Sequence, residues 1–204
     1  ITIITQVIVD KQDPAFQNPT KPVGPFYPKD EADKLARLNN WVFKEDPRKR
    51  GWRRVVAPPK PLKINNKKSI ETLARNGQIV IAVGGGGIPV FYVEPNKLQG
   101  IDAVIDKDLA SALLATQIGA DEFFILTDVP RVCINFNTPE QKELNMITVS
   151  EAKQYLIQGH FAEGSMAPKI RAAIYFVENG GHETIITTST ELHKTDCGTK
   201  IIND

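Results

Sequence analysis

Several short stretches of this 204-residue sequence combine glycine or lysine with acidic side chains in ways that suit phosphate binding. Gly84–Gly87 is a run of four glycines that directly follows the apolar segment Gln78–Val83. Because glycine has no Cβ, successive backbone N–H groups of such a loop can face one anion at close range. No Lys-Ser/Thr pair follows, so the loop is neither a P-loop nor a GxGxxG loop. A plain tight turn is the alternative, but turns seldom need four glycines, and anion binding is favoured.

The second stretch is Asp106-Lys107-Asp108, which lies where an apolar strand gives way to a helix. In a structural interpretation, the two Asp residues cap the helix and favour its positive end, while Lys107 is solvated. In a functional interpretation, Lys107 contacts a transferring phosphate and the carboxylates hold and orient it. Taken alone, the motif favours the structural interpretation.

Two further stretches place polar side chains at the ends of secondary-structure elements. Thr127-Asp128 ends the apolar strand 122–129, where Asp128 could accept a hydrogen bond from a nucleotide or cap the next turn. Ser165–Lys169 opens a helix, so free N–H groups and the Lys169 ammonium point the same way and form an anion site. A lysine at that helix end opposes the macrodipole by about 0.3–1 kcal/mol, which favours a ligand there.

Apolar periodicity predicts the elements that position these stretches. Helices alternate with apolar strands, which favours an α/β fold with a mostly parallel sheet covered on both faces. In such folds ligands bind at the carboxyl ends of the strands. The expected helices are 67–76, 107–118, 148–158 and one with Pro168 in its first turn; the expected strands are 1–9, 78–83, 122–129, 183–188 and 199–202. Residues 13–28 are rich in proline and are expected to form loop, turn or edge hairpin.

Composition excludes several classes of protein. Lys plus Arg number 25 and Asp plus Glu number 24, so net charge gives no reason to expect nucleic acid or a membrane as partner. The longest apolar runs are far too short to span a bilayer, and no secretory signal is visible. Cys133 and Cys197 are therefore expected to be free thiols in a reducing, cytoplasmic compartment.

Two other groups of residues are explained without a ligand. The basic residues around Trp41 and Trp52 resemble a nucleic-acid patch, but Glu45 and Asp46 lie among them, so an ion-paired hairpin is favoured. The histidines share no metal spacing, so no protein metal site is expected, and we interpret them as surface or loop residues: His160, His182 and His193.

Taken together, these motifs resemble carbamate kinases, which are amino-acid kinases. The Asn-Pro-Thr-Lys-Pro motif within 13–27 resembles the protruding subdomain of those enzymes, and the similarity extends over essentially the whole chain. The blocks that match in order are 13–27, Gly51–Val56, Gly84–Gly87 with Ile88-Pro89, Ala103–Leu109, Leu126–Val129 and Gly164–Met166.

The resemblance implies an open three-layer αβα sandwich with a protruding, hairpin-like subdomain. Residues 1–13 would be a strand of the main domain, 14–60 a lid, and 61–204 the nucleotide-binding C-terminal lobe. The implied reaction is reversible phosphoryl transfer between ATP and carbamate, giving ADP and carbamoyl phosphate with Mg²⁺. The implied assembly is a homodimer that acts in arginine catabolism, in the arginine deiminase pathway.

The resemblance also assigns roles to residues. Lys107 and Lys169 resemble phosphate-contacting lysines, with Asp106 and Asp108 positioning Lys107, and Lys21 resembles a lysine that reaches over the site from the lid. The nucleotide side would be lined by Gly84, Gly85, Gly86, Gly87, Thr127, Asp128, Ser165 and Met166. The family's N-terminal Gly-Gly-Asn loop matches nothing here, so we expect the isolated 204 residues to be incomplete for catalysis.

Some positions depart from the family pattern. Ala167 stands where glycine is usual, so a methyl group is expected to crowd the phosphate side, and Val83, Arg131 and Cys133 replace other usual residues. The substitutions at 167, 131 and 133 support one alternative, a catalytically impaired subunit that only binds nucleotide or a partner. Retention of the lysines speaks against it. Another alternative, a relative of acetylglutamate or glutamate kinase, is disfavoured by the lid sequence around Lys21.

Overall fold

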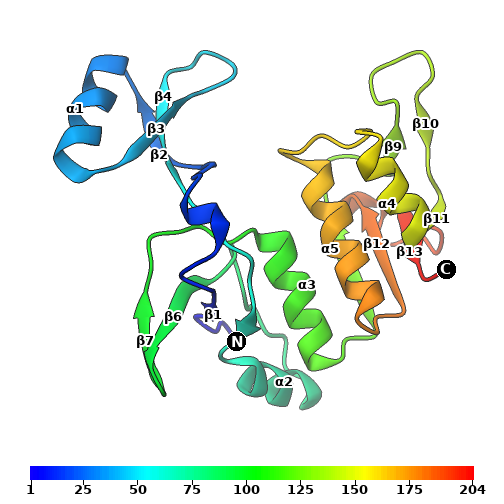
Figure 1. The fold of residues 1–204 in the computed structure, drawn as a ribbon. Coiled ribbons are helices and arrows are strands. Elements are labelled where there is room, and N and C mark those ends of the chain that lie inside the picture. Colours follow the sequence, from blue (N-terminus) through cyan, green and yellow to red (C-terminus); the bar gives the residue numbers. More distant parts are fainter.

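The computed structural model describes residues 1–204 and confirms the α/β class (Figure 1). The helices are α1 Lys29–Asn39, α2 Lys67–Arg75, α3 Lys107–Ile118, α4 Val149–Ile157 and α5 Met166–Glu178, with 3-10 turns at Pro14–Phe16 and Ser189–Glu191. The strands are β1 Gln6–Ile8, β2 Lys21–Tyr27, β3 Val42–Glu45, β4 Trp52–Val56, β5 Lys63–Ile64, β6 Ile88–Glu94, β7 Lys97–Gly100, β8 Glu122–Leu126, β9 Cys133–Ile134, β10 Lys142–Glu143, β11 Met146–Thr148, β12 Glu183–Thr187 and β13 Thr199–Ile202. None of these helices has the length and apolar character needed to cross a membrane.

Two four-stranded sheets of mixed direction take the place of the single, mostly parallel sheet expected from the alternation. Their strand orders are β5-β1-β6-β7 and β11-β13-β12-β8. Parallel pairs join β1 to β6, β11 to β13 and β12 to β8, while β6–β7 and β12–β13 are antiparallel. The β6–β7 pair is a tight hairpin through Asn96, whose φ of 64° suits such a turn. Local turn chemistry therefore sets strand direction here.

Two segments expected as buried strands are more exposed than predicted. In 78–83, only Ile81 forms a bridge, to Thr2, and the side chains of Ile79 and Ile81 are 86% and 60% exposed. Strand β8 is shorter than 122–129, and Phe124 and Leu126 are exposed along it. Strand β8 is at the edge of its sheet, and 78–83 lies outside both four-stranded sheets and bonds to residues 1–3 on one side, so the apolar composition of these segments does not predict their burial.

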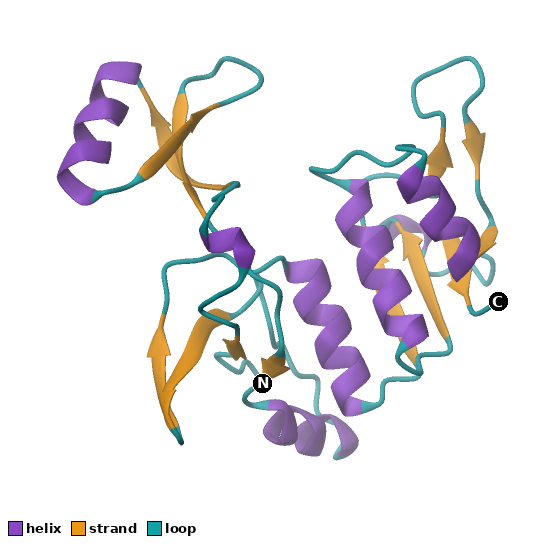
Figure 2. Cartoon of the chain, in the orientation of Figure 1, coloured by secondary structure: helices purple, strands orange, loops and turns teal.

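Helix α3 joins the two hydrophobic cores of the molecule. Its Ala112 and Ala115 belong to a core of 18 buried residues built on α4, α5 and the second sheet. Its Ala110 and Leu113 belong to a core of 8 buried residues beside the first sheet. Figure 2 shows α4 and α5 covering one face of the second sheet, with α3 next to α5. A helix that is apolar on opposite sides must be packed on both, which fixes its axis and its N-terminus.

Helix α1 and a three-stranded sheet of order β2-β4-β3, which together span residues 21–56, form an arm that projects from the first sheet (Figure 1). Because β2 is an edge strand, it tolerates Pro22 and Pro25, which cannot donate to a ladder. The expectation of edge structure for this proline-rich region agrees with the observed strand.

A lysine-lined cleft as the candidate active site

The buried carboxylate of Asp108 links the N-terminal turns of α3 and α5. Its Oδ1 accepts a hydrogen bond from Lys107 Nζ at 2.8 Å, and its Oδ2 accepts one from Lys169 Nζ at 2.9 Å. Burial raises the pKa of the Asp108 carboxyl, but the hydrogen bonds from Lys107 and Lys169 outweigh it and leave the pKa below its ordinary value. Asp108 is therefore ionised at neutral pH and holds two ammonium groups together.

Asp106 connects the arm to the same helix terminus. Its Oδ1 accepts from the backbone N–H of Asp108 at 3.0 Å and of Leu109 at 3.4 Å, so it caps α3. Its Oδ2 accepts from Lys21 Nζ at 3.1 Å. The structural and functional interpretations of this motif are compatible, because one carboxylate both caps the helix and places a lysine of the arm.

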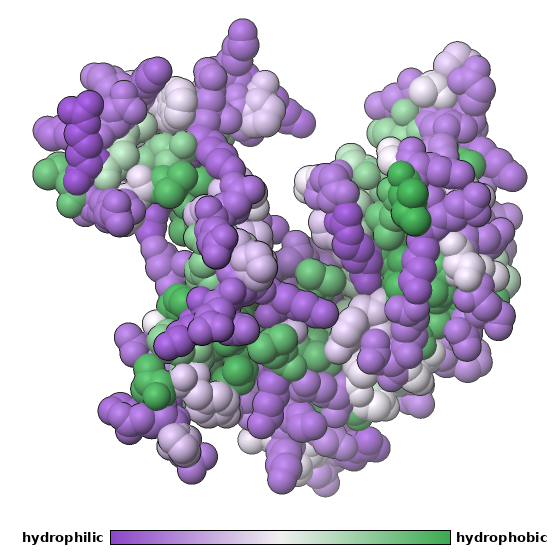
Figure 3. All heavy atoms as spheres, in the orientation of Figure 1, coloured by the Kyte–Doolittle hydropathy of each residue, from purple (hydrophilic) through white to green (hydrophobic).

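These groups line a cleft of about 1000 Å³ between the arm and the C-terminal half. Figure 3 shows the surface hollowed between these two parts. The expected site residues that line it are Lys21, Gly85, Asp106, Lys107, Asp108, Thr127, Ser165 and Lys169. The sequence analysis missed Arg171 and Glu163, which also line it and form a two-bond ion pair at 2.8 and 2.6 Å. These hydrogen bonds from Arg171 hold the pKa of Glu163 below its usual range.

Two of the remaining expected residues line a neighbouring pocket of about 540 Å³, whereas Gly84 and Gly87 line a separate hollow beside Thr5. Asp128 and Met166 lie in this pocket, and Thr127 and Ser165 lie on the wall shared with the cleft. The Thr127 hydroxyl donates to Asp128 at 3.1 Å, which orients that carboxylate. The cleft and the pocket are therefore contiguous at Thr127 and Ser165.

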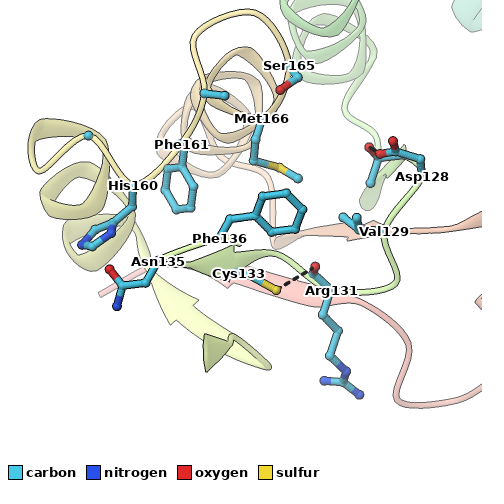
Figure 4. Close-up of a pocket in the computed structure, with 13 residues that line it drawn as sticks. Asp128, Val129, Arg131, Cys133, Asn135, Phe136, His160, Phe161, Ser165 and Met166 are labelled. Carbon is cyan, nitrogen blue, oxygen red and sulfur yellow. Dashed lines mark hydrogen bonds between the residues drawn. The ribbon is translucent and has the colours of Figure 1, made fainter. Parts of the chain in front are cut away.

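Much of the apolar side of this pocket comes from residues that sequence reasoning did not select. Phe136 and Phe161 point into it beside the expected Met166 in Figure 4, and His160, interpreted from sequence as a surface or loop residue, is half-buried next to them. Phe136 lies on a loop between Asn135 and Asn137, whose φ values of 52° and 60° are left-handed, and it lines the pocket while remaining 53% exposed. An aromatic residue between two asparagines was the available signal.

Arg131 and Cys133 are held by the protein itself. The Arg131 guanidinium donates to Asn145 Oδ1 and to the carbonyl oxygen of Asp196, the latter at 3.0 Å. Burial, with the nearby Glu143 carboxylate, raises the pKa of the Cys133 thiol, so the thiol is neutral at pH 7. Both residues shape the pocket without adding a reactive group.

The methyl group of Ala167 does not crowd the phosphate side, contrary to the sequence-based expectation. Ala167 is fully buried in the larger core, and it lines neither the cleft nor the neighbouring pocket. It lies in the first turn of α5, where its amide donates to the Ala162 carbonyl at 3.0 Å and its methyl group packs into the core. One argument for an impaired site is thereby removed.

The tetraglycine loop divides into positions with different reasons for lacking a side chain. A Cβ on Gly86 would lie 2.2 Å from the Ile105 carbonyl oxygen, and one on Gly87 would lie 2.6 Å from Val7 Cγ2. A Cβ on Gly85 would meet nothing within 4 Å, and Gly85 is the only one of the four that lines the cleft. The amides of Gly85 and Gly87 have no backbone acceptor. Gly85 therefore lies at the wall of the cleft with an N–H that has no backbone acceptor.

Helix α5 adds one more free amide. Ser165, its N-cap residue, makes no side-chain capping bond. The Ala167 amide donates to the Ala162 carbonyl and Pro168 has no N–H, so among the first three residues of the helix it is the Met166 amide that lacks a backbone acceptor. Backbone amides and lysines thus converge on one space from the glycine loop, α3, α5 and the arm. Such a set of donors suits a polyanion, and phosphate groups above all.

Comparison with known proteins shows the family of the chain. The model of the amino acid kinase family matches residues 35–188, so the chain belongs to the amino acid kinase family. The carbamate kinase of Thermoplasma volcanium is 54% identical over 186 residues, which is 91% of this chain and 60% of that protein. The carbamate kinase of Thermococcus kodakarensis is 50% identical over 206 residues, 100% of this chain and 65% of that protein.

A solved structure agrees. A carbamate kinase from Giardia lamblia bound to AMP-PNP superimposes with a TM-score of 0.90 at 46% identity, covering 100% of this chain and 65% of that one. The αβα type of kinase fold is thereby confirmed. This chain thus spans about 60–65% of the length of the curated relatives it matches.

The contrast between neighbouring glycines can be tested by stability measurements. We expect Gly86→Ala to lower the free energy of unfolding by roughly 1–3 kcal/mol or more, since its φ of 123° and the Ile105 carbonyl both oppose a Cβ. Gly85→Ala, its matched control, should stay within about 0.5 kcal/mol of wild type. Urea unfolding measures both, and equal losses would show that the loop geometry is not as described.

The lowered pKa of Asp108 predicts a pH dependence of stability. A carboxyl with a depressed native pKa contributes stability above its unfolded pKa of about 4 and loses it as pH falls through the lower native value. The difference in unfolding free energy between wild type and Asp108→Asn should therefore be largest near pH 7 and shrink below pH 4. A difference that stays constant from pH 7 to pH 2 would contradict the ion pairing.

Proposed function

We propose that this protein transfers a phosphoryl group reversibly between ATP and carbamate, giving ADP and carbamoyl phosphate. The observation that carries the proposal is the convergence of Lys21, Lys107 and Lys169 on one cleft through Asp106 and Asp108. Phosphoryl transfer needs positioning and charge neutralisation more than a covalent nucleophile, and this set of donors supplies both. Relatives at 50–54% identity that carry the name carbamate kinase support the choice of acceptor.

In this proposal each charged residue has one role. Lys107 and Lys169 contact the transferring phosphoryl group, and Asp108 keeps them at a fixed separation. Asp106 positions Lys21, which reaches the reacting end of the cleft from the arm. The arm, as part of a lid of residues 14–60, acts as a cover that excludes water when it closes.

The nucleotide would lie across the two spaces. Its base fits the pocket with Met166, and Thr127, Asp128 and Ser165 line the passage to the phosphates. The amide of Gly85 faces the phosphate end, with Gly84, Gly86 and Gly87 shaping the loop. AMP-PNP, bound by the Giardia lamblia relative, has the form that this placement requires.

Mg²⁺ would be carried mainly by the phosphates in this proposal. Both Asp108 oxygens accept from lysines, and the fold gathers no group of three or more His, Cys, Asp and Glu residues. Mg²⁺ commonly binds through substrate phosphates and water rather than an all-protein cage, and when bound it neutralises phosphate charge. A cytoplasmic homodimer that acts in arginine catabolism completes the proposal for the whole protein.

The reaction is tested by measuring ATP formation from ADP and carbamoyl phosphate, with Mg²⁺, using protein expressed from the whole gene. We expect ATP formation with carbamoyl phosphate and none above background with acetyl phosphate or N-acetylglutamyl phosphate. If the protein prefers another acyl phosphate, carbamate is not its phosphoryl acceptor. Nucleotide binding without turnover of any of them would instead support the impaired subunit.

Lys107→Ala should lower the turnover of that protein by on the order of 10²-fold or more while it remains folded, since a transition-state charge contact is lost. Lys153→Ala is the matched control, because Lys153 is 51% exposed and paired with Glu178, much as Lys107 is 56% exposed and paired with Asp108. Circular dichroism establishes folding and steady-state kinetics measure turnover. Near-normal turnover of folded Lys107→Ala would remove this lysine from the reaction.

A further inference from the structure

The residue before the tetraglycine loop has an unusual backbone conformation. Val83 has a φ of 62°, in the left-handed region that β-branched residues rarely adopt, and its side chain is buried in the smaller core. Gly84 follows with a φ of 43°, so two successive residues are left-handed. Strain of this kind persists only where the surroundings enforce it, and it concentrates at functional sites.

Thr5 holds the loop at both ends. Its Oγ1 accepts a hydrogen bond from the Val83 N–H at 2.9 Å and donates one to the Ile3 carbonyl at 3.0 Å. Its own carbonyl oxygen accepts from the Ile88 N–H at 2.8 Å, directly after the four glycines. Thr5 is itself buried beside β1. One residue therefore sets the entry and the exit of the loop.

Within these two anchors the loop is closed by bonds of its own. The Gly84 N–H donates to the Ala82 carbonyl and the Gly86 N–H donates to the Val83 carbonyl, both at 2.7 Å. This pattern uses alternate amides and leaves that of Gly85 free at the wall of the cleft. If Val83 relaxed to a negative φ, the Val83 carbonyl would turn away from Gly86 and the free amide would lose its direction.

We propose that Thr5 is a positioning residue for phosphate binding, acting through the left-handed Val83 to aim the Gly85 amide into the cleft. The inference rests on the proposed function, since it takes the nucleotide phosphates as the anion that Gly85 meets. Thr5 does not line that cleft, so it acts only through the loop. Its hydroxyl is the required group, because it satisfies the Val83 N–H, which is buried and has no other acceptor.

The test compares Thr5→Val, which removes the hydroxyl at nearly constant shape, with Thr5→Ser, which keeps it. Thr184→Val is the matched control, because Thr184 is also fully buried and donates its hydroxyl to the Ala173 carbonyl at 3.5 Å, within the other core. Calorimetric titration with AMP-PNP should give a Kd on the order of tenfold weaker for Thr5→Val. Thr5→Ser and Thr184→Val should remain within about twofold of wild type.

A second measurement needs no nucleotide. Amide hydrogen exchange of ligand-free protein should be faster at Gly84 and Gly86 in Thr5→Val and unchanged in Thr184→Val. If wild type fails to bind AMP-PNP, the proposed function fails, while the exchange rates still decide whether Thr5 orders the loop. Unchanged exchange in Thr5→Val, or equal changes in Thr184→Val, overturns the inference.

Variants of Val83 test the same inference if Thr5→Val does not fold. Val83→Ala loses the same buried methyl groups as Val83→Gly but keeps a Cβ, so it serves as the control for the cavity and should keep the Kd within about threefold. Val83→Gly frees both signs of φ and should speed exchange at Gly84 and Gly86 and weaken AMP-PNP binding. Equal behaviour of Val83→Ala and Val83→Gly would show that the left-handed geometry has no part in binding.

Discussion

The geometry of the cleft depends on one buried carboxylate between two ammonium groups. Asp108 is almost inaccessible, and an unpaired carboxylate there would be strongly destabilising. Lys107 from α3 and Lys169 from α5 remove that penalty together, and each limits where the other can lie. The interaction thus connects the N-termini of α3 and α5 at the cleft, where the ammonium groups of Lys107 and Lys169 lie.

Packing behind this ion pair keeps it in place. Helix α3 carries Ala112 into the larger core and Leu113 into the smaller one, so it cannot rotate without breaking one of them. Asp106 caps the same helix and also accepts a hydrogen bond from Lys21. This bond connects the arm to the N-terminus of α3. The two halves and the arm therefore meet at three consecutive residues, 106–108.

The sequence predicted best what depends on local chemistry. The bounds of α3 follow from its apolar spacing, its Asp106 cap and Gly119, and the capping box of α4 at Thr148 was visible as a Thr-x-x-Glu pattern. Strand burial was less predictable, because exposed Ile79 and Phe124 have the same composition as buried strand residues. The pocket residues Phe136 and His160 lie on loops whose course depends on backbone conformation and distant packing, and neither carries a spacing signal.

The individual roles of the four glycines also required coordinates. The sequence predicts that the backbone of this loop approaches an anion closely. For Gly85, at the wall of the cleft, this is still a prediction. Gly86 and Gly87 lack side chains for another reason, the nearness of Ile105 and Val7. Likewise, the consequence of Ala167 could not be read from a motif, because a motif does not say which way a helix face points.

The balance of charge explains why the cleft uses backbone amides as well as lysines. Lys21, Lys107 and Lys169 are offset by Asp106 and Asp108, and Arg171 by Glu163, so the cleft carries a net charge of about +1. A further lysine would have to be desolvated or paired with another carboxylate, which would repel phosphate. The N–H groups of Gly85 and Met166, which have no backbone acceptor, can add attraction without a counter-charge. Neutral donors held by the fold therefore supplement the small excess of positive charge in attracting a polyanion.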